Sequence, residues 1–184
     1  MNLSVVLKDV WGDVESAYNS GYMVNESMMA FVLWKGIKDR RPELCVTYDA
    51  RIDSKKRHRP DLVIWEDGPK PSVLFVCELK FKPEYYSIYR GDIAKLKSIN
   101  KNHVLDVLTR NPMTGDTKTT PIKKSKDFGI GFFAIANWDA AAVTYSNVTQ
   151  TLSDDEKAIF HFAFGSIPGN TDREIIFQYD APLG

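Results

Sequence analysis

The apolar positions of the chain follow two different periods. Up to Arg41 they recur at helical spacing, and from Leu44 to Phe81 they form short, nearly continuous runs. The helical pattern predicts one helix over residues 4–19 and a second that starts after the N-cap residue Asn25 and ends at Arg41. The apolar runs predict three strands, of which the last is the most apolar and therefore central in a sheet, over residues 44–52, 61–66 and 73–81.

The second half of the chain alternates between polar and apolar segments. Its pattern predicts, in order, a helix over 87–100, a short helix over 104–109, a long loop over 111–127, a strand over 131–138, a helix from Ser153 to near Gly165 and an edge strand over 174–179. Helices that flank a mixed central sheet define an α/β fold class. We expect a single domain over residues 1–184, with a core at about 25–138, a helical N-terminal extension over 1–24, and a C-terminal helix and strand over 150–184.

Composition narrows the class of protein. The chain has 184 residues, 43% of them hydrophobic, and its 24 Lys and Arg balance 24 Asp and Glu. This excludes a disordered chain and a strongly basic nucleic-acid coat. The longest apolar run, Met28–Trp34, is too short for a membrane helix, and Cys45 and Cys77 lie in apolar segments as expected of buried free thiols. We therefore expect a soluble, intracellular, cytoplasmic protein with no membrane partner.

Charged residues interrupt the apolar runs at one place. Asp61 opens the second predicted strand, and Glu78 and Lys80 end the third. If the connection between these strands lets Glu66 face Val73, then Asp61 lies opposite Glu78, and opposed residues point to the same face of a sheet. Lys80, two residues after Glu78, shares that face. Two carboxylates and one ammonium group should therefore converge.

Such a cluster needs compensation. Burial of charge is costly, and two adjacent carboxylates repel each other. A bound Mg²⁺, with Mn²⁺ as a substitute, would relieve both effects, and Asp61, Glu78 and the backbone carbonyl of Leu79 would be its protein ligands. Lys80 would then lie beside a metal-bound water or a phosphate, where it would orient or deprotonate the water.

Simpler interpretations remain open for each of these residues. Asp61 would also fit a turn-end carboxylate paired with Arg57 or Arg59, and Glu78 with Lys80 would fit a buried ion pair, although such a pair contributes little to stability. Three further acidic-x-Lys tripeptides occur in polar segments, where exposed charge is the better interpretation. Only the copy at Glu78 ends a buried strand.

The order of these elements resembles the PD-(D/E)xK nuclease superfamily, whose members have a restriction-endonuclease-like core. In that family a helix bearing a Glu is followed by a strand, a strand with the Asp, a strand with Glu-x-Lys, and a helix. The resemblance covers roughly residues 25–100, with 131–138 as a continuation, and its positions here are Glu26, 44–52, Asp61, Glu78 with Lys80, and 87–100. It implies a metal-dependent endo- or exonuclease that hydrolyses phosphodiester bonds, with Glu26, Asp61, Glu78 and Lys80 as catalytic residues. The resemblance leaves both DNA and RNA open as the substrate, and of the two we expect DNA.

The position of Glu26 agrees with two interpretations. It lies in the first turn of its helix on the same stripe as Met29, Leu33 and Ile37, so its carboxylate should lie at the edge of the buried face, within reach of the sheet end. Alternatively, it merely favours the positive end of the helix dipole.

Nucleic-acid contacts are predicted from the basic residues near these elements, although a solvated connection explains the first run equally well. The candidates are Lys55, Lys56, Arg57, Arg59, Lys123 and Lys124. A core of this size would surround a duplex only as a homodimer or together with a partner domain. Two alternatives to a nuclease stay open: a catalytically inactive nuclease-like module that binds nucleic acid or a protein, and a structural domain with an incidental ion pair.

Overall fold

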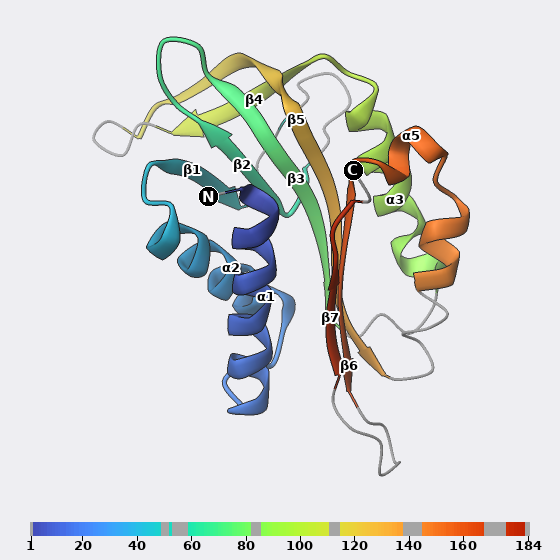
Figure 1. Ribbon diagram of the computed structural model, residues 1–184. Coiled ribbons are helices and arrows are strands. Elements are labelled where there is room, and N and C mark those ends of the chain that lie inside the picture. The colour runs from blue at the N-terminus through green and yellow to red at the C-terminus, as the bar shows by residue number, and fades with distance from the viewer. Residues whose placement is uncertain are drawn as a thin grey trace.

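The protein is an α/β structure in which helices cover both faces of one mixed sheet (Figure 1). This confirms the predicted fold class. The computed structural model describes residues 2–48, 52, 59–81, 86–110, 115–137, 145–167 and 176–182. In this part of the chain no helix has the length and hydropathy that a bilayer crossing needs.

An N-terminal helical pair is followed by groups of two or three strands with helices between the groups. The helices are α1 (Leu3–Asn19), α2 (Glu26–Arg40), α3 (Tyr86–Asn100) and α5 (Asp154–Lys157), and residues 145–150 are also helical. The strands are β1 (Leu44–Tyr48), β2 (Leu62–Glu66), β3 (Ser72–Phe81), β4 (Val104–Arg110), β5 (Thr117–Asn137), β6 (Phe160–Ile167) and β7 (Ile176–Asp180).

The sheet has the order β1-β2-β3-β5-β6-β7, and β4 pairs with β5 outside this path. β3 is antiparallel to β2 and parallel to β5, so it is central, as its continuous apolarity predicts. The first part of β5 pairs with β4 and its last part pairs with β6. β7 is the edge strand beyond β6, which confirms the predicted edge position.

Each face of the sheet has its own apolar core. The α1 and α2 face buries Phe75, Cys77 and Leu79 of β3, and the α3 face buries Val73 and Val76 of the same strand. From Phe75 to Leu79 this alternation is the period-two pattern of a strand covered on both sides, whereas Val73 precedes an irregularity in the ladder. It also assigns Glu78 and Lys80 to the α3 face. Cys77 is a buried free thiol, as predicted, and Cys45 is a half-buried one.

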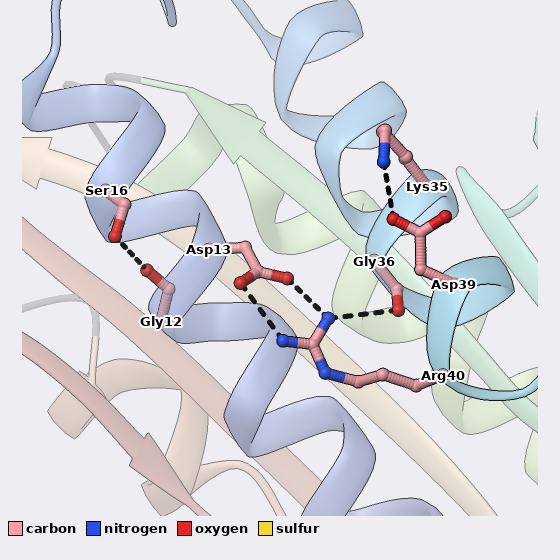
Figure 2. A network of polar contacts seen from close by, with 7 residues as sticks. All are labelled: Gly12, Asp13, Ser16, Lys35, Gly36, Asp39 and Arg40. Carbon is pink, nitrogen blue, oxygen red and sulfur yellow. Dashed lines mark hydrogen bonds and ion pairs between the residues drawn. The ribbon is translucent and has the colours of Figure 1, made fainter.

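A close contact joins α1 to α2 (Figure 2). Arg40 donates from both terminal nitrogens to the Asp13 carboxylate, at 2.6 and 3.1 Å, and also to the backbone oxygen of Gly36. A Cβ on Gly36 would lie 2.8 Å from Asp13 Oδ2 and 2.9 Å from Val10 Cγ1, so the helices approach closely because residue 36 has no side chain. Side-chain caps start both helices, with Asn2 accepting from the amide of Ser4 and Asn25 from that of Met28.

Three predictions for the second half of the chain are wrong. Residues 104–109 are part of strand β4, not a helix, and residues 117–127 belong to β5, not to a loop; residues 111–114 lie outside the described part. The helix after Ser153 has its predicted capping box with Glu156 but ends at Lys157, and β6 follows. In each case pairing with a neighbouring strand overrides the local pattern.

Candidate active site at the end of β2 and β3

The β2–β3 register brings Asp61 beside Glu78. Leu62 pairs with Cys77 and Val63 with Val76, so Asp61, which directly precedes β2, lies opposite Glu78. The prediction that Glu66 faces Val73 is wrong, because Glu66 pairs with Ser72. A bulge after Ile64 shifts the register by one residue, and the pairing at the Asp61 end is therefore the one that the sequence suggested.

Asp61 closes the end of the ladder with its side chain. Its Oδ2 accepts a hydrogen bond from the backbone amide of Leu79 at 2.7 Å. β3 continues past Cys77, its last residue paired with β2, so the carboxylate takes the place of a strand partner. The N–H and C=O groups of one residue point to the same edge of a strand. The carbonyl of Leu79 therefore lies on the Asp61 side of β3.

Glu26 reaches the same edge from the other layer. It is the first residue of α2, and its carboxylate accepts from the backbone of Phe81, two residues beyond Leu79. Its Oε2 lies 3.8 Å from Lys80 Nζ. Glu26 and Asp61 are near enough for the charge of Asp61 to raise the pKa of Glu26. The predicted position of Glu26 at the sheet end therefore agrees with its surroundings.

Two further charged residues come from α3, and the sequence reasoning missed both. Lys95 Nζ lies 2.7 Å from Glu78 Oε1, 3.3 Å from Asp92 Oδ1 and 3.0 Å from the backbone oxygen of Arg59. Asp92 Oδ2 in turn lies 3.1 Å from Lys80 Nζ. The signal was present, because Asp92 and Lys95 stand on the helical stripe that the apolar residues of α3 define.

Burial raises the pKa values of the carboxylates in this cluster. Glu78 is 1% exposed, and burial together with the charge of Asp61 raises its pKa to about 9. Burial also raises the pKa of Asp61, although the hydrogen bond from Leu79 lowers it in part. Burial likewise raises the pKa of Glu26, which the charge of Lys80 lowers in part. Perturbed carboxylates that share one end of a sheet are typical of functional sites.

Lys80 and Lys95 stay firmly protonated. Burial on its own would lower the pKa of each, but the surrounding carboxylates outweigh it and raise both values, led by Asp92 for Lys80 and by Glu78 for Lys95. The two ammonium groups therefore act as fixed positive charges.

The predicted basic residues do not all lie near this cluster. Lys123 and Lys124 pair with Ser72 and Val73, at the opposite end of β3, roughly 20 Å from Glu78 at the rise of a strand. Lys124 donates to the backbone oxygen of Asn100 at 2.6 Å and lies 4.6 Å above the Phe128 ring, so it has a structural role. Lys55, Lys56 and Arg57 lie outside the described residues. Arg59 directly precedes Pro60 and Asp61, and its backbone binds Lys95.

The oxygen donors expected to hold Mg²⁺ at this end of the sheet are two carboxylates and one backbone carbonyl. Within the described part of the chain, no group of three or more His, Cys, Asp or Glu side chains is placed to hold a metal ion. Protein sites for Mg²⁺ commonly use only one or two carboxylates and leave the remaining positions to water and phosphate. Asp61, Glu78 and the Leu79 carbonyl would supply such a set, while Lys95 already compensates one oxygen of Glu78.

Comparison of the chain with family models, with curated proteins and with solved structures gave no match. The features that bear on function are the order of the elements and the geometry at the end of β3. These features agree with one another at Asp61, Glu78 and Lys80.

Proposed function

We propose that the protein is a metal-dependent nuclease that hydrolyses phosphodiester bonds of nucleic acid, with DNA preferred. The observation that carries the proposal is the position of the buried Glu78 carboxylate beside Asp61, with the Lys80 ammonium two residues further on the same face. The order of these elements, which resembles that of the PD-(D/E)xK superfamily, supports the same conclusion.

Each residue has a distinct task in this proposal. Asp61 and Glu78, with the Leu79 carbonyl, would hold Mg²⁺ or Mn²⁺. When bound, the cation polarises the phosphate and lowers the pKa of the attacking water. Lys80 orients that water and offsets charge that develops on the phosphate. Because its pKa is raised, Lys80 is poorly suited to be the general base, so the orienting role is favoured over the deprotonating one.

The remaining charged residues position this set. Asp92 lies between Lys80 and Lys95 and restrains both ammonium groups. Glu26 contacts Lys80 from the opposite layer of the fold, which limits the movement of the lysine along the edge of β3. These contacts leave Lys80 18% exposed, so it faces the surface from a fixed position.

Cleavage of linear, circular, branched and single-stranded DNA and RNA, with Mg²⁺, Mn²⁺ or chelator, tests the proposal. Asp61→Asn and Lys80→Met should each lower the rate by on the order of a thousandfold, about 4 kcal/mol of barrier. Asn keeps an oxygen that accepts from Leu79, so the sheet edge stays closed. Glu66→Gln, at the far end of β2, is the matched control and should cleave normally. Undiminished metal-dependent cleavage by both site variants would contradict the mechanism.

The second candidate function is binding without cleavage, and the Lys95–Glu78 pair favours it. At 2.7 Å, Lys95 compensates Glu78 with no need of a metal ion. Calorimetric titration with Mn²⁺ separates the two functions. A nuclease should take up Mn²⁺ and lose this uptake in Asp61→Asn, whereas a pure binding module should show no uptake in either protein.

A further inference from the structure

One side of α2 exposes a cluster of large apolar residues. Phe31 is 60% exposed and Tyr22 is 74% exposed, although both belong to a protein whose sheet is covered on both faces. We call this cluster the aromatic surface; its members, which line two adjoining hollows, are Tyr22, Met28, Phe31, Trp34 and Tyr48. Large exposed apolar groups that lie together usually mark a binding surface.

The aromatic surface has a shape suited to flat ligands. The rings of Phe31 and Trp34 are stacked, with centroids 6.2 Å apart and planes 22° apart. A hollow of about 370 Å³ lies beside them, lined by Ser27, Ala30, Phe31, Trp34 and Tyr48. A second hollow, of about 390 Å³, shares Ser27 and Phe31 with the first. Phe31 therefore separates two adjacent apolar hollows.

The surface adjoins the candidate active site through two elements. Ser27, which lines both hollows, directly follows Glu26 on α2. Tyr48, the last residue of β1, pairs with Leu62, the residue after Asp61. A chain-like ligand that lay on the aromatic surface would therefore reach the end of β3 by a short path.

We propose that the aromatic surface stacks unpaired bases of a single-stranded nucleic acid whose backbone continues to Asp61 and Glu78. The proposal rests on the proposed function for the cleavage step, and it names the form of the substrate. Exposed aromatic rings bind bases of any sequence because every base has a π face. Positive charge to attract phosphates is present at the end of the path, where Arg59 precedes Asp61 and Lys80 and Lys95 lie beside Glu78 and Asp92.

A second copy of the chain is a weaker explanation of this surface. A stable interface uses roughly 20–30 residues on each side. The aromatic surface has five members, far fewer than such an interface uses. Stacked rings next to a site that handles phosphodiesters agree better with nucleobases.

The test measures binding in the presence of chelator, where no cleavage occurs. The probes are a fluorescent oligothymidine, an abasic oligomer of the same length and a blunt duplex. The double variant Phe31→Leu/Trp34→Leu keeps apolar bulk but removes both rings. It should bind oligothymidine at least tenfold more weakly and bind the abasic oligomer as wild type does. Tyr145→Leu, an exposed aromatic residue that contacts Phe162 in the other core, is the matched control and should change neither affinity.

Three results would overturn the inference: unchanged affinity for oligothymidine, an equal loss for the abasic oligomer, or preferential binding of the duplex. Sedimentation of wild type and double variant tests self-association, and a dimer lost in the variant would assign the surface to a second copy. Circular dichroism verifies that the variant is folded. Because binding is measured without metal, its outcome is separate from that of the cleavage assay on Asp61→Asn.

Discussion

Glu78 is the residue whose chemistry is most altered by its position. It is almost fully buried at the end of a central strand, and its ionised form has lost nearly all contact with water. Lys95 and the nearby Asp61 act on it in opposite directions, the first favouring the charged form and the second opposing it. Residues held in such positions are commonly retained for activity at a cost in stability.

Glu78→Gln should stabilise the protein at neutral and alkaline pH. The folded pKa of Glu78 is raised from the ordinary 4.5 to about 9. Between these values the unfolded chain has released the proton and the folded chain has kept it, so the free energy of unfolding falls as the pH rises. Gln has no proton to release. We expect a gain on the order of 1–3 kcal/mol at pH 8 and almost none at pH 4, measured by urea unfolding.

The exposed Glu66→Gln variant is the control for this experiment, since it removes a carboxylate from the same hairpin. It should follow the pH dependence of the wild type. An equal pH dependence of wild type and Glu78→Gln would show that Glu78 is ionised in the folded protein, compensated by Lys95.

Sequence reasoning could predict part of this site because strand pairing is periodic. Asp61, Glu78 and Lys80 are fixed relative to one another by one hairpin, and alternation along β3 sets their common face. Asp92 and Lys95 could not be placed in the same way, because their contacts depend on how α3 lies on the sheet. The bulge after Ile64 also has no clear signal in the sequence. It offsets the one-residue error in the predicted pairing of Glu66, so Asp61 still lies opposite Glu78.

At the scale of elements, the close contact between α1 and α2 depends on a glycine, Gly36, at the point where the helices meet. Gly36 and Gly12 are both helical glycines. A Cβ added to Gly36 would lie within 3 Å of Val10 and Asp13, whereas a Cβ added to Gly12 would have no atom within 4 Å. Helix propensity alone favours alanine at both positions by about 1 kcal/mol. The surroundings should therefore decide the sign of each substitution.

We predict that Gly36→Ala destabilises the protein by about 1–2 kcal/mol and that Gly12→Ala stabilises it by up to about 1 kcal/mol. In Gly36→Ala the new methyl group displaces the Asp13 carboxylate from Arg40, and it also presses on Val10. Thermal unfolding of the two variants beside the wild type measures both effects. Stabilisation of similar size in both would mean that α1 and α2 separate easily.

The wrong predictions in the second half of the chain have a common physical origin. The first part of β5 is rich in Thr and Lys and has few apolar residues, so it lacks the pattern of a buried strand. It is held by β4, which pairs with it from Val104 to Arg110. Strand formation there is a property of the pair. In contrast, α1 and α2 carry caps and apolar stripes of their own, α3 carries an apolar stripe, and all three were predicted from the sequence.

At the scale of the whole molecule, the balanced net charge conceals a local excess of negative charge. The cluster at the end of β3 contains four carboxylates, of Glu26, Asp61, Glu78 and Asp92, and two ammonium groups. At neutral pH, where the raised pKa keeps Glu78 protonated, the formal charge of the cluster is 2 − 3 = −1, and it becomes 2 − 4 = −2 when all four carboxylates are ionised. A divalent cation that binds there should stabilise the folded chain as a whole, because the unfolded chain has no such site.

We predict that Mn²⁺ raises the melting temperature of the wild type and that chelator reverses the rise. At a concentration about 100 times the dissociation constant, the added stability is about 2.7 kcal/mol. Asp61→Asn should show little or no rise, and NaCl at equal ionic strength controls for screening. If Mn²⁺ raised the melting temperatures of wild type and Asp61→Asn equally, the ion would be bound elsewhere.

The overhang of β3 beyond β2 has a consequence for solubility. A strand with unpaired amides is a template on which another polypeptide can add, and it is a common starting point for aggregation. Asp61 and Glu26 occupy the amides of Leu79 and Phe81 with acidic side chains, which neither extend the sheet nor tolerate a hydrophobic neighbour. The carboxylates of the proposed nuclease site thus also block this edge of the protein against strand addition.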